Sequence, residues 1–194
     1  MDFISTRNAS PAAGLSQAIA AGLAPDGGLY VPSRLPPPRE LRAGATLAQT
    51  TAALLAPFFE GDPLSAELPA ICAEAFDFPV PLRPLATPGD HVLELFHGPT
   101  AAFKDVGARF LAACLARIRR GEPRPLTILV ATSGDTGAAV AAAFHRQPGL
   151  RVVVLYPDGR VSPRQAHQLG CFGDNVQALR VAGSFDDCQA LVKR

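Results

Sequence analysis

The sequence predicts an α/β fold in which helices flank a parallel sheet, preceded by a smaller, mainly helical amino-terminal subdomain. Three observations carry this prediction. Past about residue 85, short apolar runs alternate with helical stretches of ten or more residues, as in strand–helix–strand units. Before it, the chain is irregular and interrupted by turn residues. Prolines gather around the apolar run at residues 80–85, so we divide the chain into residues 1–85 and 86–194.

The second part supplies the predicted sheet and its helices. The expected strands are residues 92–96, 127–131, 151–156 and 176–181. The expected helices are residues 104–120, 136–144, 163–169 and 185–194. Ser184 and Asp187 resemble a capping box at the start of the last helix. No receiving strand follows that helix, so we expect the sheet to be incomplete and the chain to be cut within a continuing domain.

The amino-terminal part is predicted from its turn chemistry. We expect a helix over residues 15–21, a turn at Pro25-Asp26-Gly27-Gly28 and a short strand over 29–31. A further helix is expected over 47–59, interrupted at Pro57.

Composition excludes several classes of protein. Hydrophobic residues make up 48% and charged residues 18%, which is typical of a folded domain. A net charge of +1 without long blocks of one sign argues against a nucleic-acid partner. The four cysteines form no C-x-x-C pair and the histidines have no ligand spacing, so we expect no metal site and a reducing cytoplasm. No signal peptide or membrane span is expected.

One candidate for chemistry is Lys104, which follows a predicted strand end and the turn at Gly98-Pro99. A desolvated lysine can form a Schiff base, because burial disfavours its ammonium form. Phe96, Ala101, Ala102 and Phe103 could provide such surroundings. The residues alone leave a solvated surface lysine as the alternative.

A second candidate is the loop Thr132-Ser133-Gly134-Asp135-Thr136-Gly137, between an apolar strand and an alanine-rich helix. Glycines allow close backbone approach, and free N–H groups at a helix start attract anions. A carboxylate or phosphate is therefore an expected ligand. The alternative is an ordinary helix cap. The spacing matches neither the dinucleotide fingerprint nor a Walker A loop.

Together these segments resemble the threonine synthase family. The matching residues are His97-Gly98-Pro99-Thr100, Phe103-Lys104-Asp105 and the run from Ala131 to Gly137, with further pieces at 25–30, 155–157, 162–163 and 185–193. The chain is similar to the amino-terminal part of the long bacterial type. This resemblance implies a fold-type II pyridoxal-phosphate enzyme, tryptophan synthase β-like in fold. Its expected reaction is conversion of O-phospho-L-homoserine and water to L-threonine and phosphate, the last step of threonine biosynthesis.

The resemblance also implies residue roles. Lys104 is expected to carry pyridoxal 5'-phosphate and to act as the catalytic base, with Phe103 and Asp135 beside the cofactor. The residues expected to bind the substrate are Thr132, Ser133, Gly134, Thr136, Gly137, Thr100 and His97. Amides of Gly134 and Gly137 are expected to support the substrate carboxylate, with Asp135 turned toward the cofactor's ring oxygen or the loop's own amides.

Some alternatives remain open. His97 could instead satisfy its turn, and Arg109 could bind the substrate phosphate or form a structural ion pair. The protein could be another fold-type II lyase, such as a threonine or serine dehydratase or a phospholyase, or a non-catalytic anion-binding fragment. The groups that would bind the cofactor phosphate and pyridine nitrogen are not found, so the isolated chain is expected to be inactive. An exposed sheet edge could pair two copies into a homodimer.

Overall fold

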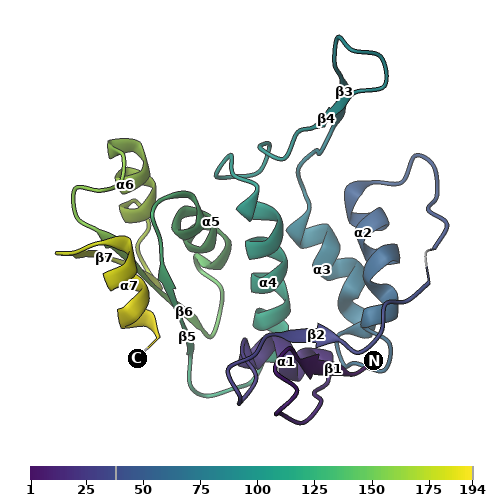
Figure 1. Cartoon of the computed structure of the whole chain (residues 1–194), viewed down its shortest axis with the longest axis horizontal. Helices are drawn as coiled ribbons and strands as arrows, with labels where there is room; N and C mark the ends of the chain where they lie inside the picture. The colour runs from purple at the N-terminus through teal and green to yellow at the C-terminus, as the bar shows by residue number, and fades with distance from the viewer. Residues whose placement is uncertain (38, 194) are drawn as a thin grey trace. The chain divides into compact units, whose positions relative to one another are not determined.

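The computed structural model describes residues 1–37 and 39–193, which form two compact units (Figure 1). The first unit comprises Met1–Asp77 and Ala113–Ile118, and the second comprises Phe78–Ala112 and Arg119–Arg194. The predicted division into an amino-terminal subdomain, residues 1–85, and an α/β domain, residues 86–194, stays a prediction.

The first unit contains short elements in the order β1, α1, β2, α2, η1, η2 and α3. Their bounds are Phe3–Ser5, Leu15–Ala21, Tyr30–Pro32, Leu47–Leu55, Ala56–Phe58, Ser65–Glu67 and Leu68–Ala75. The predicted helix over 15–21 is confirmed, and the predicted strand at 29–31 lies one residue further on. It pairs antiparallel with β1, which was not predicted. The predicted helix over 47–59 ends at Leu55 and continues as the 3-10 turn η1, which contains Pro57.

Helix α3 provides much of the core of this unit. Leu68, Ile71, Cys72 and Ala75 recur at helical spacing and are all buried. Cys114, on the part of α4 that belongs to this unit, is also fully buried. Pro69 in the first turn of α3 interrupts no intrahelical bond, because the first N–H groups of a helix have no internal partner.

The turn at Pro25-Asp26-Gly27-Gly28 is confirmed and is held by the Asp26 carboxylate. It accepts hydrogen bonds from the Ser5 hydroxyl at 2.7 Å and from the amides of Ala9 and Gly28 at 2.9 Å. The Ser5 bond leads the effects that lower the pKa of Asp26 to about 2. A charged Asp26 therefore ties β1 to the turn before β2.

The second unit contains a parallel sheet in the order β5-β6-β7, with bounds Leu126–Ala131, Leu150–Pro157 and Val176–Val181. Helices α5 (Asp135–Phe144) and α6 (Pro163–Gly170) follow the first two strands and pack against each other. Helix α7 (Phe185–Val192) packs against β5 and β6. Alternate residues of β6, Val152, Val154 and Tyr156, are buried, which fixes the face of the strand that meets the core. The predicted parallel sheet with flanking helices is confirmed for these strands.

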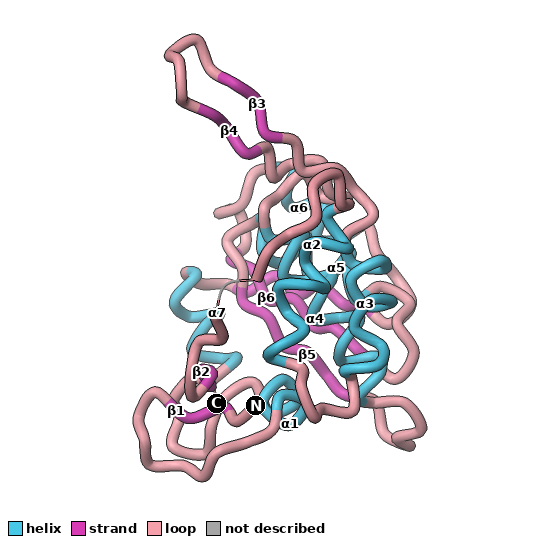
Figure 2. Tube along the Cα trace, turned by 90° about the vertical axis from the view of Figure 1, so that its right-hand side faces the viewer, coloured by secondary structure: helices cyan, strands magenta, loops and turns pink. Residues whose placement is uncertain are grey.

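The expected sheet strand at residues 92–96 is wrong. The structure has a shorter strand, β4 (His91–Leu93), which pairs antiparallel with β3 (Leu82–Pro84) in a separate hairpin. Figures 1 and 2 show this hairpin projecting away from the three-stranded sheet. The amide of Leu85 donates to the carbonyl of Asp90 at 2.9 Å, so a local turn pairs the two strands. An apolar run of this length does not reveal which partner it will pair with.

The predicted helices are confirmed with small shifts. Helix α4 (Lys104–Ile118) begins at the predicted residue. Helix α7 has the predicted capping box, in which Ser184 Oγ accepts from the Asp187 amide at 3.2 Å and Asp187 Oδ2 accepts from the Ser184 amide at 2.7 Å. Its expected last residue, Arg194, lies outside the described residues. Within residues 1–37 and 39–193, no helix is long and apolar enough to cross a membrane.

Candidate active site

Lys104 is the first residue of α4 and follows a tightly folded turn. The amide of Ala101 donates to the carbonyl of Gly98 at 3.1 Å, and the amide of Asp105 donates to the carbonyl of Ala102 at 3.0 Å. Ala101 adopts a φ of 55°, a left-handed conformation that is uncommon for a residue other than glycine. The backbone before Lys104 is therefore held in one defined shape.

Asp105 holds this turn together. Its side chain is 1% exposed and accepts two hydrogen bonds from Thr100, from the amide at 2.9 Å and from the hydroxyl at 2.7 Å. Gly98 allows this packing, since a β-carbon at that position would lie 2.5 Å from Asp105 Oδ2. Asp105 thus fixes the residue before it, Lys104, by anchoring the start of α4 to the turn.

The Lys104 side chain itself is accessible. Lys104 is exposed, and its Nζ lies 5.7 Å from the centroid of the Phe103 ring. Phe96 and Phe103 are 54% and 59% exposed, so the apolar enclosure expected around the lysine is not formed by the described residues. The whole sequence contains two lysines, Lys104 and Lys193, beside many arginines. An arginine cannot form a Schiff base, which makes Lys104 conspicuous.

Other residues predicted near Lys104 have their own partners. His97 Nε2 lies 2.7 Å from Glu94 Oε2, and its ring lies 4.7 Å from the Phe96 ring. Thr100 gives its single hydroxyl hydrogen to Asp105, so its oxygen remains only as an acceptor. The Arg109 guanidinium lies 5.8 Å from the Phe78 ring, a cation–π arrangement.

The loop before α5 is built around Thr132, which is 2% exposed. Thr132 Oγ1 accepts from the amides of Gly134 and Gly137, at 3.0 and 2.9 Å, and donates to the carbonyl of Gly134 at 3.1 Å. The expectation that these two amides support a bound carboxylate is therefore wrong. Thr132 instead holds the loop in shape through these three hydrogen bonds, and the N-cap residue of α5 is Gly134.

Other donors of the loop remain available. The amides of Asp135 and Thr136 and the hydroxyls of Ser133 and Thr136 have no hydrogen-bond partner in the described part of the chain, and all three residues are exposed. The first amides of a helix have no intrahelical acceptor and carry partial positive charge. The loop can therefore receive an anion, but through the amides of Asp135 and Thr136 instead of those of Gly134 and Gly137.

Asp135 points toward α6. Its Oδ1 accepts from Gln165 Nε2 at 3.1 Å, and among the described residues it accepts no hydrogen bond from the loop's own amides. Gly134 and Gly137 allow α6 this close, because an added β-carbon would collide with Gln165 at the first and with Thr132 and Leu169 at the second. Sequence reasoning missed both Asp105 and Gln165. The Ser162-to-Gln165 spacing predicts a capping box but not the contact with Asp135.

Both segments belong to the same compact unit. Figures 1 and 2 show the amino-terminal part of α4 running beside α5. An accessible primary amine and a set of free anion donors are the groups that an aldehyde cofactor bound to an anionic amino acid would need. The residues present therefore fit pyridoxal phosphate in these two respects.

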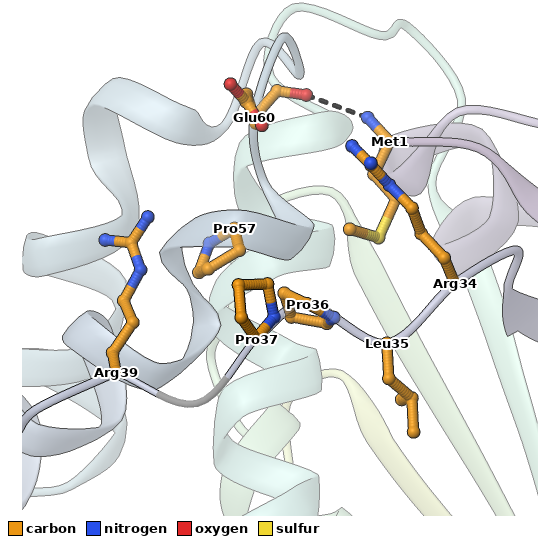
Figure 3. A pocket seen from close by; sticks show the side chains of 8 residues that line it. All are labelled: Met1, Arg34, Leu35, Pro36, Pro37, Arg39, Pro57 and Glu60. Carbon is orange, nitrogen blue, oxygen red and sulfur yellow. Dashed lines mark hydrogen bonds between the residues drawn. The ribbon is translucent and has the colours of Figure 1, made fainter.

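A shallow pocket lies elsewhere, within the first unit (Figure 3). It has a volume of about 170 Å³ and is bordered by Arg34, Pro36, Pro57 and Glu60, whose carbonyl accepts from the amino terminus at 2.9 Å. It contains none of the predicted site residues. In the described part of the chain, no cluster of three or more His, Cys, Asp or Glu side chains could hold a metal ion.

Comparison with known proteins identifies the family. Residues 88–194 match the family described as "Pyridoxal-phosphate dependent enzyme", which is more than half of the chain. The chain belongs to this family. Residues 2–76 match a second family, "Threonine synthase N terminus". The fold-type II pyridoxal-phosphate fold implied by the sequence is thereby confirmed.

Relatives of this chain with an assigned name include threonine synthases. The chain is 42% identical to that of Haemophilus influenzae over 181 residues, covering 92% of this chain and 42% of the relative. It is 43% identical to that of Escherichia coli over 183 residues, again covering 92% and 42%. The chain therefore spans less than half the length of these relatives.

Solved structures agree. A structure of pyridoxal-phosphate-bound threonine synthase from Brucella melitensis superposes with a TM-score of 0.87 and 40% identity, covering all of this chain and 44% of that one. The Escherichia coli threonine synthase gives a TM-score of 0.85 and 38% identity, covering 100% and 45%. The resemblance to threonine synthases inferred from the two motifs is confirmed.

Proposed function

We propose that the protein containing this chain is a threonine synthase that converts O-phospho-L-homoserine and water to L-threonine and phosphate. The observation that carries the proposal is the pairing, within one compact unit, of an accessible lysine at a clamped helix start with a loop whose remaining donors suit a carboxylate. Similarity to threonine synthases over 92–100% of the chain supports this reading.

In this proposal pyridoxal phosphate, when bound, supplies an electron sink that stabilises negative charge at the substrate Cα. Lys104 Nζ would hold the cofactor, and the same amine would accept the proton from the substrate Cα as a general base. Asp105 keeps the amine in place through Thr100 and the turn. Phe103 offers an exposed ring face beside Lys104.

The loop orients the substrate in the same proposal. The α-carboxylate of the substrate accepts hydrogen bonds from the hydroxyls of Ser133 and Thr136 and from the amides of Asp135 and Thr136. Thr132, Gly134 and Gly137 act indirectly by holding the loop in shape. His97 and Thr100 are assigned to the pocket wall, where Thr100 can only accept a hydrogen bond.

The first test is borohydride trapping of pyridoxal phosphate on the full-length protein, followed by peptide mapping. We expect the label on Lys104, with Lys193→Arg as a matched control that leaves labelling intact and Lys104→Arg abolishing it. A label on any other lysine contradicts the assignment.

A substrate panel tests the reaction itself. We expect equal amounts of phosphate and threonine to form from O-phospho-L-homoserine. Release of 2-oxobutyrate from threonine, or of pyruvate from serine, as the principal activity would indicate a dehydratase instead.

Location and assembly remain part of the proposal. Four free cysteines, three of them buried, support a reducing cytoplasm. A homodimer stays a prediction from edge-strand physics, and the mass of the full-length protein in light scattering tests it.

A further inference from the structure

Gln165 bridges two parts of the second unit through the two ends of its side-chain amide. Its Oε1 accepts from the Ser162 amide at 3.1 Å and so completes the cap of α6. Its Nε2 donates to Asp135 Oδ1 at 3.1 Å, in the first turn of α5. An amide can do both because its oxygen and nitrogen have fixed and opposite roles.

The packing around this contact leaves little freedom. Gly134 has a φ of 152°, and a β-carbon there would collide with the Gln165 side chain. One turn further along α6, Leu169 packs against the site where Gly137 has no side chain. Helix α6 thus packs against both glycines of the loop. Gln165, which also binds Asp135, lies against Gly134.

The contact with Gln165 matters because the Asp135 carboxylate could otherwise turn toward the free amides at the start of α5. A carboxylate in the first turn of a helix is attracted by the free amides there, which here belong to Asp135 and Thr136. If Asp135 turned toward them, it would compete with an anionic ligand and repel it. Gln165 holds the carboxylate on the α6 side, away from those donors.

We infer that Gln165 is a positioning residue for the substrate-carboxylate loop, acting through Asp135. This inference rests on the proposed function and deepens it, because it names a specificity element outside both motifs. It assigns α6 the task of keeping the loop receptive to an anionic amino acid.

The decisive variant is Gln165→Glu in the full-length protein. It keeps the oxygen that accepts from Ser162 and replaces only the donor that faces Asp135. Two carboxylates then oppose each other, and we expect the KM for O-phospho-L-homoserine to rise roughly tenfold at about pH 8 with kcat within about twofold. Ser162→Ala is the matched control, because it weakens the same cap and leaves the contact with Asp135 intact.

The pH dependence separates positioning from structural damage. Once protonated, the carboxyl group that Gln165→Glu introduces can donate to Asp135, so the ratio of variant to wild-type KM is expected to fall as the pH is lowered. Charged groups on the elements packed against α6 are Asp135 on α5 and Arg180 on β7, which is engaged with Tyr156 and Asp158. On α6 itself, Arg164 and His167 are exposed.

Hydrogen exchange of the cofactor-free protein gives a readout that does not depend on activity. The Gly134 and Gly137 amides, held by Thr132, are expected to exchange several-fold faster in Gln165→Glu than in wild type or Ser162→Ala. The double variant Asp135→Asn/Gln165→Glu restores the bond with donor and acceptor exchanged, and should restore the slow exchange.

The outcomes separate the two proposals. A wild-type protein that forms no threonine refutes the proposed function, whatever Gln165 does. An active wild type in which Gln165→Glu matches Ser162→Ala in KM at every pH, or in loop exchange, overturns the role of Gln165 alone.

Discussion

The turn that presents Lys104 should depend on the Thr100–Asp105 contact, and the structure allows the size of this dependence to be worked out. Thr100→Val removes the 2.7 Å bond from the hydroxyl to Asp105 Oδ1 and keeps the shape of the side chain. Hydrogen bonds to charged groups contribute about 1.5–3 kcal/mol, so we expect this loss in the free energy of unfolding. Asp105→Ala removes both bonds and should cost about 3–5 kcal/mol.

A reporter specific to the second unit is available in the sequence. The chain has no tryptophan and two tyrosines, of which Tyr30 lies in the first unit and Tyr156 in the second. In a Tyr30→Phe background, tyrosine fluorescence during urea denaturation therefore follows the second unit. Asp90→Ala, in the exposed hairpin turn, is the matched control and should change stability by no more than about 0.5 kcal/mol.

A double-mutant cycle measures how far the two side chains depend on each other. Thr100→Val should cost little once Asp105→Ala is present, because the acceptor is already gone, so the coupling energy should be about 1.5–3 kcal/mol. A coupling below about 0.5 kcal/mol would show that Asp105 does not hold the turn through the Thr100 hydroxyl.

Contacts within each unit predict further effects on stability. Asp26→Asn should lower the free energy of unfolding at neutral pH. Because folding lowers the pKa of Asp26 from 3.8 to about 2, the carboxylate contributes its full stabilisation above pH 3.8 and loses it as the pH falls to about 2. The gap between wild type and variant in urea titrations should close over that window, and a constant gap would contradict the assignment. Arg117→Met removes the 3.0 Å bonds to Glu67 and Glu74 from a side chain that is 13% exposed. It should lower the free energy of unfolding of the first unit by about 1–2 kcal/mol, measured by Tyr30 fluorescence in a Tyr156→Phe background. Gly137→Ala should lower the free energy of unfolding of the second unit, followed by Tyr156 fluorescence, by about 1–3 kcal/mol, because the new methyl group collides with Thr132 and Leu169. An unchanged stability would mean that α6 shifts to make room for the methyl group.

The fold could be predicted where one local pattern decides the structure. Strands β5, β6 and β7 are apolar runs bounded by helices, and the cap at Ser184 follows from its spacing to Asp187. Residues 92–96 could not be assigned, because the same apolar pattern suits a sheet strand or an exposed hairpin. Strand β1 and helix α3 were missed, since one is three residues long and the other begins around a proline.

The site was predictable as a set of residue types but not as a set of interactions. Lys104 at a helix start and the loop before α5 follow from sequence, and their partners do not. Asp105 is charged and follows a lysine in a helical run, so nothing local predicts that its side chain is 1% exposed. Gln165 lies on a different helix from Asp135, and only the packing of α6 on α5 reveals their contact.

The loop shows why counting donors in a sequence overestimates an anion site. Residues 132–137 carry several N–H and O–H groups, but a loop must also satisfy its own buried polar atoms. Thr132 takes two of the amides for that purpose, and its own hydrogen goes to the Gly134 carbonyl. Because these bonds are already formed, the loop needs little reorganisation to receive a ligand, and the donors left over are those of Ser133, Asp135 and Thr136. The same bonds that remove half of the expected donors therefore hold the remaining ones in place, which is the condition under which a few hydrogen bonds can orient a substrate.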